Sequence, residues 1–143
     1  MHADFDLGLE SVPRGSETIL LVEPDPETRK LAAFMLSKQG YTVLEARNAA
    51  EAFQLYQERG WEVDLLLTEA LMCEVNGPEL ARVLSAKDPR LRVVYISDSD
   101  SRRLTRSRTK PVLVQRPFTM RLLADKVRQV LDGQQRRPVA LGA

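Results

Sequence analysis

The chain has 143 residues, 43% of them hydrophobic and 29% charged, with a net charge of +1, which predicts one domain with an ordinary core. Its apolar runs are far shorter than the ~18 residues of a membrane span, and no secretory signal precedes residue 20, so we expect a cytoplasmic protein without membrane contact. One cysteine, Cys73, and one histidine, His2, exclude an internal disulfide and a metal cluster built from thiolates or imidazoles.

The first half of the chain alternates strand and helix signals. Apolar runs predict three strands, at Thr18–Val22, Tyr41–Ala46 and Val63–Thr68. Asp25 is expected to cap a helix that begins at Pro26 and stops at Gly40. Asn48 is expected to cap a second helix, which stops at Gly60. The residues predicted to face the core are Leu31, Phe34 and Met35 in the first helix and Ala49, Ala52, Phe53 and Tyr56 in the second.

The second half continues this alternation. A helix is expected to open at Asn76 or Gly77 and to close at Asp88. Two strands are predicted, at Arg92–Ser97 and Val112–Gln115. The polar stretch between them leaves room for only a short helix around Arg102–Ser107. Thr119 is expected to cap the last helix. The inward residues of these helices are predicted to be Leu80, Val83 and Leu84, then Leu123, Val127, Val130 and Leu131.

Five strands and five helices in alternation predict an α/β domain with a doubly wound, five-stranded parallel sheet. This domain is expected to cover residues 17–132. Residues 1–16 are interpreted as a linker or N-terminal extension and residues 133–143 as a C-terminal tail, because neither has sustained periodicity.

Charge is distributed unevenly along the chain. Residues 1–76 carry 14 acids and 6 bases, whereas residues 77–143 carry 6 acids and 15 bases. Many of these bases lie between Arg102 and Lys110. A solvated face is the simplest interpretation, and a basic adaptor surface for nucleic acid or an acidic partner is the alternative. The segment contains no nucleic-acid-binding motif, which disfavours nucleic acid as the partner.

Polar residues follow the predicted strands in a definite order. Glu23 comes after the first strand, Glu69 after the third, and Gly77 eight positions later. Ser97 ends the fourth strand, and Arg116, followed by a proline, comes after the fifth. This order resembles the receiver domains of response regulators, which implies a flavodoxin-like (βα)5 fold. By this resemblance Glu69 is equivalent to the phosphoacceptor, and the switch-equivalent residues are Ser97, Leu113 and Arg116.

Two segments, Asn76–Arg82 and Gln115–Thr119, are similar to the C-terminal receivers of hybrid sensor histidine kinases. The lead-in Pro13–Glu23 also resembles the linker that precedes such a receiver. The chain is therefore interpreted as a fragment of a larger kinase or as a stand-alone protein descended from one. Val12–Ser16 overlaps a common thrombin cleavage sequence, so a remnant of cloning is the alternative for that segment.

The resemblance implies that an active receiver holds Mg²⁺ with two adjacent acids after the first strand and with the acceptor aspartate. Here the second acid is replaced by Pro24, which offers no side-chain oxygen, and Glu69 lengthens the acceptor by one methylene. At most Glu23, Glu69 and the backbone carbonyl of Leu71 could hold Mg²⁺, weakly if at all. Arg116 replaces the expected lysine, and we expect it to form a bidentate pair with Glu69.

Three further positions depart from the family pattern. Asp98 replaces a small residue after Ser97, and its charge is expected to repel a phosphate. Leu113 stands where an aromatic switch residue is usual. Cys73 replaces the usual proline in the loop after the acceptor.

Together these departures favour a degenerate receiver that binds a protein of a two-component pathway without being phosphorylated and is not an enzyme. An internal pair between Glu69 and Arg116 would stand in for phosphoaspartate and its cation. The alternatives are a functional phosphoacceptor receiver, of a hybrid kinase or a response regulator, and the basic adaptor. A homodimer is left open, and no cofactor beyond weakly bound Mg²⁺ is expected.

Overall fold

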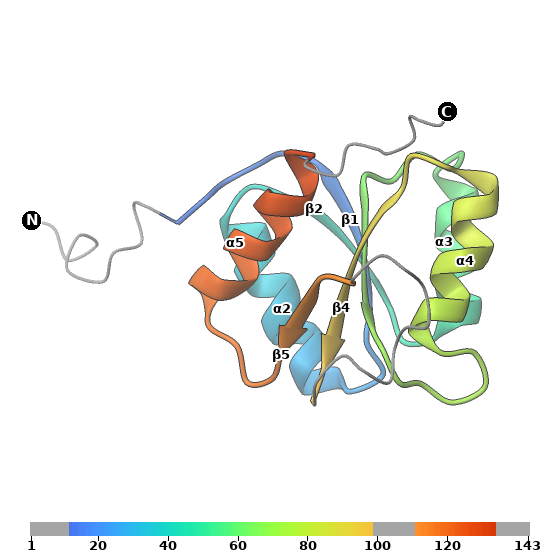
Figure 1. The fold of residues 1–143 in the computed structure, drawn as a ribbon, viewed down its shortest axis with the longest axis horizontal. Coiled ribbons are helices and arrows are strands. Elements are labelled where there is room, and N and C mark those ends of the chain that lie inside the picture. Colours follow the sequence, from blue (N-terminus) through green and yellow to red (C-terminus); the bar gives the residue numbers. More distant parts are fainter. Residues whose placement is uncertain (1–11, 99–110, 134–143) are drawn as a thin grey trace, which may run out of the picture.

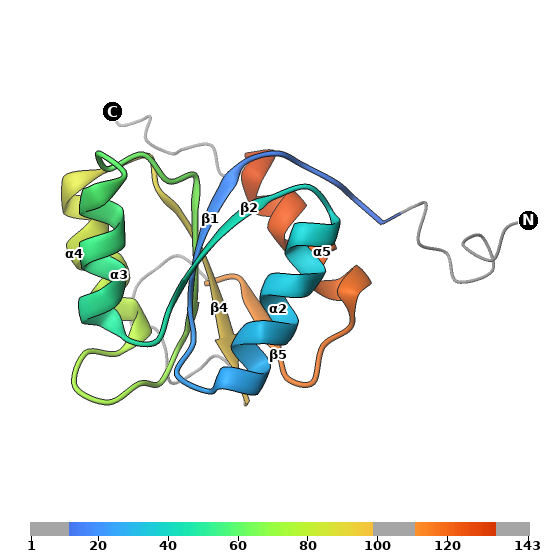
Figure 2. The same ribbon diagram turned by 180° about the vertical axis from the view of Figure 1, so that it is seen from behind.

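The computed structural model describes residues 12–98 and 111–133, which form five strands and four helices (Figures 1 and 2). The elements are β1 (Thr18–Val22), α2 (Pro26–Lys38), β2 (Thr42–Ala46), α3 (Ala49–Glu58), β3 (Leu65–Glu69), α4 (Gly77–Lys87), β4 (Arg92–Ser97), β5 (Leu113–Gln115) and α5 (Met120–Leu131). The short helix predicted around Arg102–Ser107 and the basic segment Arg102–Lys110 lie outside the described residues. In the described part of the chain, no helix is long and apolar enough to cross a membrane.

All five strands are parallel and lie in the order β2-β1-β3-β4-β5. Parallel neighbours need crossover connections, and these contain α2, α3 and α4. The helices α2 and α5 lie on one face of the sheet and α3 and α4 on the other (Figure 1). The predicted doubly wound fold is therefore confirmed. Because the strand order reverses between β1 and β3, their carboxyl ends meet at the place where open α/β sheets bind ligands.

The strand β1 is buried on both faces because its side chains alternate between two cores. Ile19 and Leu21 pack with residues of α2 and α5, whereas Leu20 and Val22 pack with residues of α3 and α4. All four are fully buried, and burial of a side chain of this size contributes roughly 1.5–3 kcal/mol. Packing of these four side chains into the two cores thus fixes the position of the end of β1, where Glu23 lies.

The three predicted helix caps, Asp25, Asn48 and Thr119, are confirmed, and Asn76 caps α4, because each side chain accepts a backbone N–H of the first turn. The pairs are Asp25 with Thr28, Asn48 with Glu51, Asn76 with Glu79 and Thr119 with Leu122. The apolar stripe predicted for α5 is also buried.

The face predicted for α2 was wrong at Leu31 and Phe34, although Met35 packs against the core as predicted. Leu31 and Phe34 are 49% and 57% exposed, and the helix instead buries Ala32, Ala33 and Leu36. The two small alanines allow the helix to approach the sheet closely, which turns the larger residues toward solvent. Val83 of α4 is likewise exposed, although Leu80 and Leu84 are buried as predicted.

Candidate functional site

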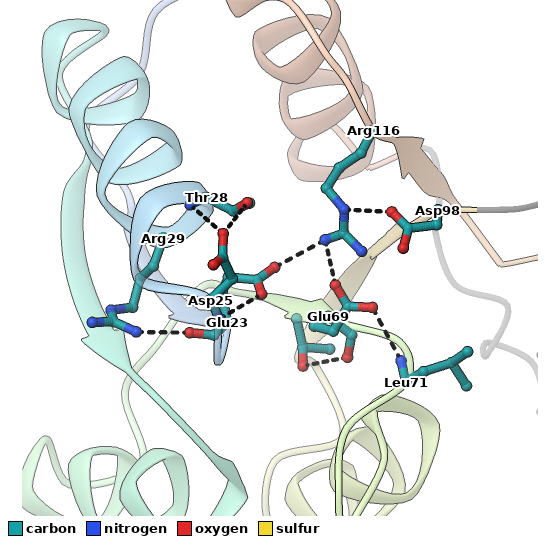
Figure 3. Close-up of polar contacts among 9 residues, drawn as sticks. Glu23, Asp25, Thr28, Arg29, Glu69, Leu71, Asp98 and Arg116 are labelled. Carbon is teal, nitrogen blue, oxygen red and sulfur yellow. Dashed lines mark hydrogen bonds and ion pairs between the residues drawn. The ribbon is translucent and has the colours of Figure 1, made fainter.

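Four charged side chains meet at the carboxyl edge of the sheet (Figure 3). Glu23 follows β1 and is 2% exposed, and Glu69 ends β3 and is 6% exposed. Arg116 follows β5, and its backbone N–H donates to the carbonyl of Ser97 at 2.9 Å. Asp98, which follows β4, reaches in from solvent. The crevice around them has a volume of about 410 Å³ and is also lined by Pro24, Asp25, Thr28 and Leu71.

The guanidinium of Arg116 is shared among three carboxylates. Its Nη1 donates to Oε1 of Glu23 at 3.1 Å and also to Oε1 of Glu69. Its Nε donates to Oδ1 of Asp98 at 2.7 Å. The predicted contact between Arg116 and Glu69 is present, but the predicted bidentate geometry was wrong, because Glu23 and Asp98 take part of the guanidinium's hydrogen-bonding capacity.

Backbone groups hold the second oxygen of each buried carboxylate. Oε2 of Glu23 accepts the N–H of Asp25 at 3.0 Å, and Oε2 of Glu69 accepts the N–H of Leu71 at 3.3 Å. Arg29 fixes the backbone behind the site, since its Nη1 donates to the carbonyl of Glu23 at 2.9 Å. In each of the two carboxylates, one oxygen thus accepts a hydrogen bond from Arg116 and the other accepts one from a backbone N–H.

Glu23 is the acid of this cluster that resists ionisation. Burial raises its pKa to about 7, and the nearby charge of Glu69 adds to the rise, although the N–H of Asp25 and the charge of Arg116 oppose it. The hydrogen bond and charge of Arg116 lower the pKa of the exposed Asp98. Burial disfavours the charged form of Arg116, but its hydrogen bonds to Asp98 and Glu69 outweigh burial and raise its pKa. The guanidinium therefore stays charged while Glu23 can take up a proton near neutral pH.

Gly77 allows the N-terminus of α4 to lie against the loop that follows Glu69. Its N–H donates to the carbonyl of Ala70 at 2.8 Å. A Cβ at this position would lie 2.5 Å from the carbonyl oxygen of Glu69, closer than real contacts allow. Only glycine fits at this position. The presence of a glycine eight residues after Glu69, one of the features on which the family resemblance depends, therefore has a steric cause in this chain.

Two of the predicted site residues, Leu113 and Cys73, lie apart from the ion cluster, whereas Leu71 borders it. Leu113 opens β5 opposite Tyr95 and is half-buried. Cys73 is exposed and lines a different groove, beside Phe53 and Leu80. Leu71 turns its side chain to solvent and contributes its N–H to Glu69. The switch role that the resemblance implies for Leu113 remains a prediction.

The described residues are a poor fit to Mg²⁺. This cation prefers six oxygens in octahedral geometry, and no group of three or more acidic, histidine or cysteine side chains placed to hold a metal occurs in residues 12–98 and 111–133. Glu23 and Glu69 both point an oxygen at the Nη1 of Arg116. Pro24, beside them, supplies no side-chain ligand. A metal would need these two carboxylates as ligands, but the guanidinium of Arg116 already occupies both.

We therefore expect Mg²⁺ to bind with a dissociation constant of about 1 mM or weaker, because it must displace a guanidinium and keep most of its water ligands. Isothermal calorimetry on the purified protein measures this constant. The variant Arg116→Met should bind Mg²⁺ more tightly, since the competing cation is gone. Submillimolar binding by the unmodified protein, unchanged in Arg116→Met, would show that the guanidinium does not compete for the site.

Sequence reasoning missed two contributions to the site. It assigned Asp98 the role of repelling phosphate, whereas the structure places Asp98 on the Nε of Arg116. It also assigned no role to Arg29, which is buried and contacts both the carbonyl of Glu23 and the carboxylate of Glu45. Arg29 lies three positions before Ala32, on the buried face of α2, but spacing alone does not distinguish this face from that of Leu31 and Phe34.

Comparison with known proteins agrees with this architecture. The profile of the response regulator receiver domain matches residues 19–128. The sensor kinase CckA of Brucella abortus (strain 2308) is 34% identical over 124 residues, which cover 84% of this chain but only 13% of the kinase. The response regulator receiver protein CpdR of the same organism is 33% identical over 122 residues, covering 79% of this chain and 95% of CpdR.

Solved structures give the same result. The receiver domain of the hybrid histidine kinase CckA has 30% sequence identity and a TM-score of 0.68, over 80% of this chain and 98% of that domain. A response regulator receiver protein from Sinorhizobium medicae has 25% identity and a TM-score of 0.74, over 82% of this chain and 96% of that one. On the extent of these matches, together with the order of polar residues at the carboxyl edge of the sheet, the chain belongs to the response regulator receiver domain family.

Proposed function

We propose that this chain is a receiver domain whose conformation is set without phosphorylation and which acts in the cytoplasm by binding a protein partner of a two-component pathway. Receiver domains are regulatory modules of these pathways, and the family membership gives the coarse function. The finer proposal depends on one observation, the contact of Arg116 with both Glu23 and Glu69.

This ion cluster is the built-in counterpart of a phosphorylated site. Phosphoryl transfer places an anion beside a metal and a lysine-like cation. Here two buried carboxylates already lie on a cation, and a third carboxylate, Asp98, reaches the same guanidinium from solvent. The charges that phosphorylation would bring together are therefore present in the unmodified chain.

The same geometry opposes phosphorylation of Glu69. Transfer requires an oxygen in line with the leaving group, but one carboxylate oxygen of Glu69 lies on Arg116 and the other on the N–H of Leu71. Each oxygen that could attack thus already accepts a hydrogen bond, and for one of them the donor is a cation, which makes it a weaker nucleophile. Pro24 lines the crevice without offering an oxygen to a metal or a metal-bound water.

We expect the protein to gain no phosphate when it is incubated with acetyl phosphate and Mg²⁺ and its intact mass is measured. The matched positive control restores the family pattern by Pro24→Asp, Glu69→Asp, Asp98→Gly and Arg116→Lys in one variant, which should gain one phosphate. A stoichiometric gain by the unmodified chain that disappears in Glu69→Gln would instead establish the alternative, a functional phosphoacceptor receiver.

The remaining alternative, a basic adaptor for nucleic acid or an acidic partner, depends on Arg102–Lys110. That segment lies outside the described residues. The adaptor therefore remains a prediction from the sequence.

A further inference from the structure

The residues that precede β1 pack against the domain. Val12 is only 4% exposed, and the segment from Val12 to Glu17 runs across the end of the layer formed by α2 and α5 (Figure 1). It leads into the start of β1, so it lies at the opposite edge of the sheet from the ion cluster. We call residues 12–17 the strap.

The peptide group that joins Arg14 to Gly15 is hydrogen-bonded through both its carbonyl and its N–H. The carbonyl of Arg14 accepts from Nη1 of Arg128 at 3.2 Å. The N–H of Gly15 donates to the carbonyl of Gln39, the C-cap residue of α2, at 3.0 Å. Further along, the carbonyl of Glu17 accepts the N–H of Thr42 at 3.0 Å. The strap is thus bonded to α5, to α2 and to the start of β2.

Arg128 of α5 is the centre of these contacts. Its Nη2 donates to Oε2 of Glu17 at 2.7 Å, and its Nη1 donates to Oε1 of Glu17 and to the hydroxyl of Tyr41, each at 3.1 Å. Its Nε donates to Asp132 in the same helix at 3.0 Å. The Arg128 side chain is 22% exposed, and charge-assisted bidentate pairs of this kind are among the stronger hydrogen bonds in proteins.

Two glycines make room for the crossing. A Cβ on Gly15 would lie 2.4 Å from both Nη1 of Arg128 and Cε1 of Tyr41. A Cβ on Gly40 would lie 2.2 Å from the carbonyl oxygen of Gly15, and Gly40 also has a φ of +105°, which favours glycine. The close crossing of the strap over this surface therefore requires glycine at both positions.

We propose that the strap is an integral part of this receiver and that Arg128 fixes it to α5. The surface formed by Gln39, Gly40, Tyr41 and Arg128 is then a peptide-binding site occupied in cis. It recognises a glycine at the crossing and an acid two residues later. This inference does not depend on the proposed function, because it concerns the opposite edge of the sheet.

Thrombin tests the proposal, because residues Val12–Ser16 contain a cleavage sequence whose scissile bond joins Arg14 to Gly15. Both flanking backbone groups are hydrogen-bonded, so the folded protein should be cut at least about tenfold more slowly than a free peptide of residues 9–20. The variant Arg128→Met should be cut at least about tenfold faster than the unmodified protein, since it loses the charged hydrogen bonds that hold the strap. The matched control is Arg47→Met, which removes an equal charge from an exposed pair with Glu51 and should leave the rate unchanged.

Two results would overturn the proposal. One is cleavage of the unmodified protein as fast as the free peptide, and the other is equal acceleration by Arg128→Met and Arg47→Met. Circular dichroism checks that each variant is folded. If Arg128→Met does not fold, Glu17→Gln provides the same comparison, because Arg128 keeps its bonds to Tyr41 and Asp132 in that variant.

Discussion

Replacing Arg116 with Met is expected to lower the free energy of unfolding by about 3 kcal/mol or more at pH 8. The reason is that Glu23 and Glu69 are 2% and 6% exposed and both contact the Nη1 of Arg116. Without the guanidinium, two negative charges would remain buried beside each other with only backbone N–H groups to stabilise them. Urea unfolding monitored by circular dichroism measures the loss.

A double-mutant cycle with Glu69→Gln separates the ion pair from packing. The coupling between the two substitutions should be about 1–3 kcal/mol, because the residues share one hydrogen bond and one crevice. Arg47→Met with Glu51→Gln is the matched control, since that pair is exposed at the start of α3, and its coupling should be close to zero. A coupling between Arg116 and Glu69 as small as that of the control would remove the basis for a built-in phosphate mimic.

The parts of this fold that could be predicted from the sequence depend on local interactions. A continuous apolar run such as Thr18–Val22 has few alternatives to a buried strand, and an N-cap such as Asp25 acts on a backbone N–H within the next few residues. The meeting of Glu23 with Glu69 was also predictable, since they lie at the carboxyl ends of neighbouring parallel strands.

The remaining features depend on contacts between distant segments. The inward face of α2 could not be decided from spacing alone, because Leu31 with Phe34 and Ala32 with Leu36 fit the helical period equally well. The division of Arg116 among three acids depends on the relative position of four strand ends, those of β1, β3, β4 and β5. The docking of Gly15 against Gly40 joins residues 25 positions apart, and sequence reasoning interpreted residues 1–16 as a linker or extension because their pattern has no period.

The stability of the domain should also depend on the proton of Glu23. Burial and the charge of Glu69 raise its pKa from 4.5 to about 7 in the folded protein, whereas in the unfolded chain it should stay near its ordinary value. Between these values the folded state holds a proton that the unfolded state has lost. The stabilisation from this proton is complete below about pH 4.5 and is lost as pH rises through about 7, by up to about 3 kcal/mol.

The test is the unfolding free energy of the unmodified protein and of Glu23→Gln between pH 4.5 and 8, in EDTA so that divalent cations do not contribute. The glutamine cannot lose a proton, so the variant should gain stability relative to the unmodified protein as pH rises. Glu51→Gln is the control, because its pairing with Arg47 lowers the pKa of Glu51. That pair loses its contribution only as pH falls below the ordinary pKa of glutamate, so the curve of Glu51→Gln should run parallel to that of the unmodified protein between pH 4.5 and 8. If Glu23→Gln and the unmodified protein follow parallel curves, Glu23 is ionised throughout this pH range, and Arg116 outweighs the effect of burial on it.

The loss of unfolding free energy caused by Arg116→Met should also be smaller at pH 5 than at pH 8, since a protonated Glu23 leaves one buried charge fewer for the guanidinium to neutralise.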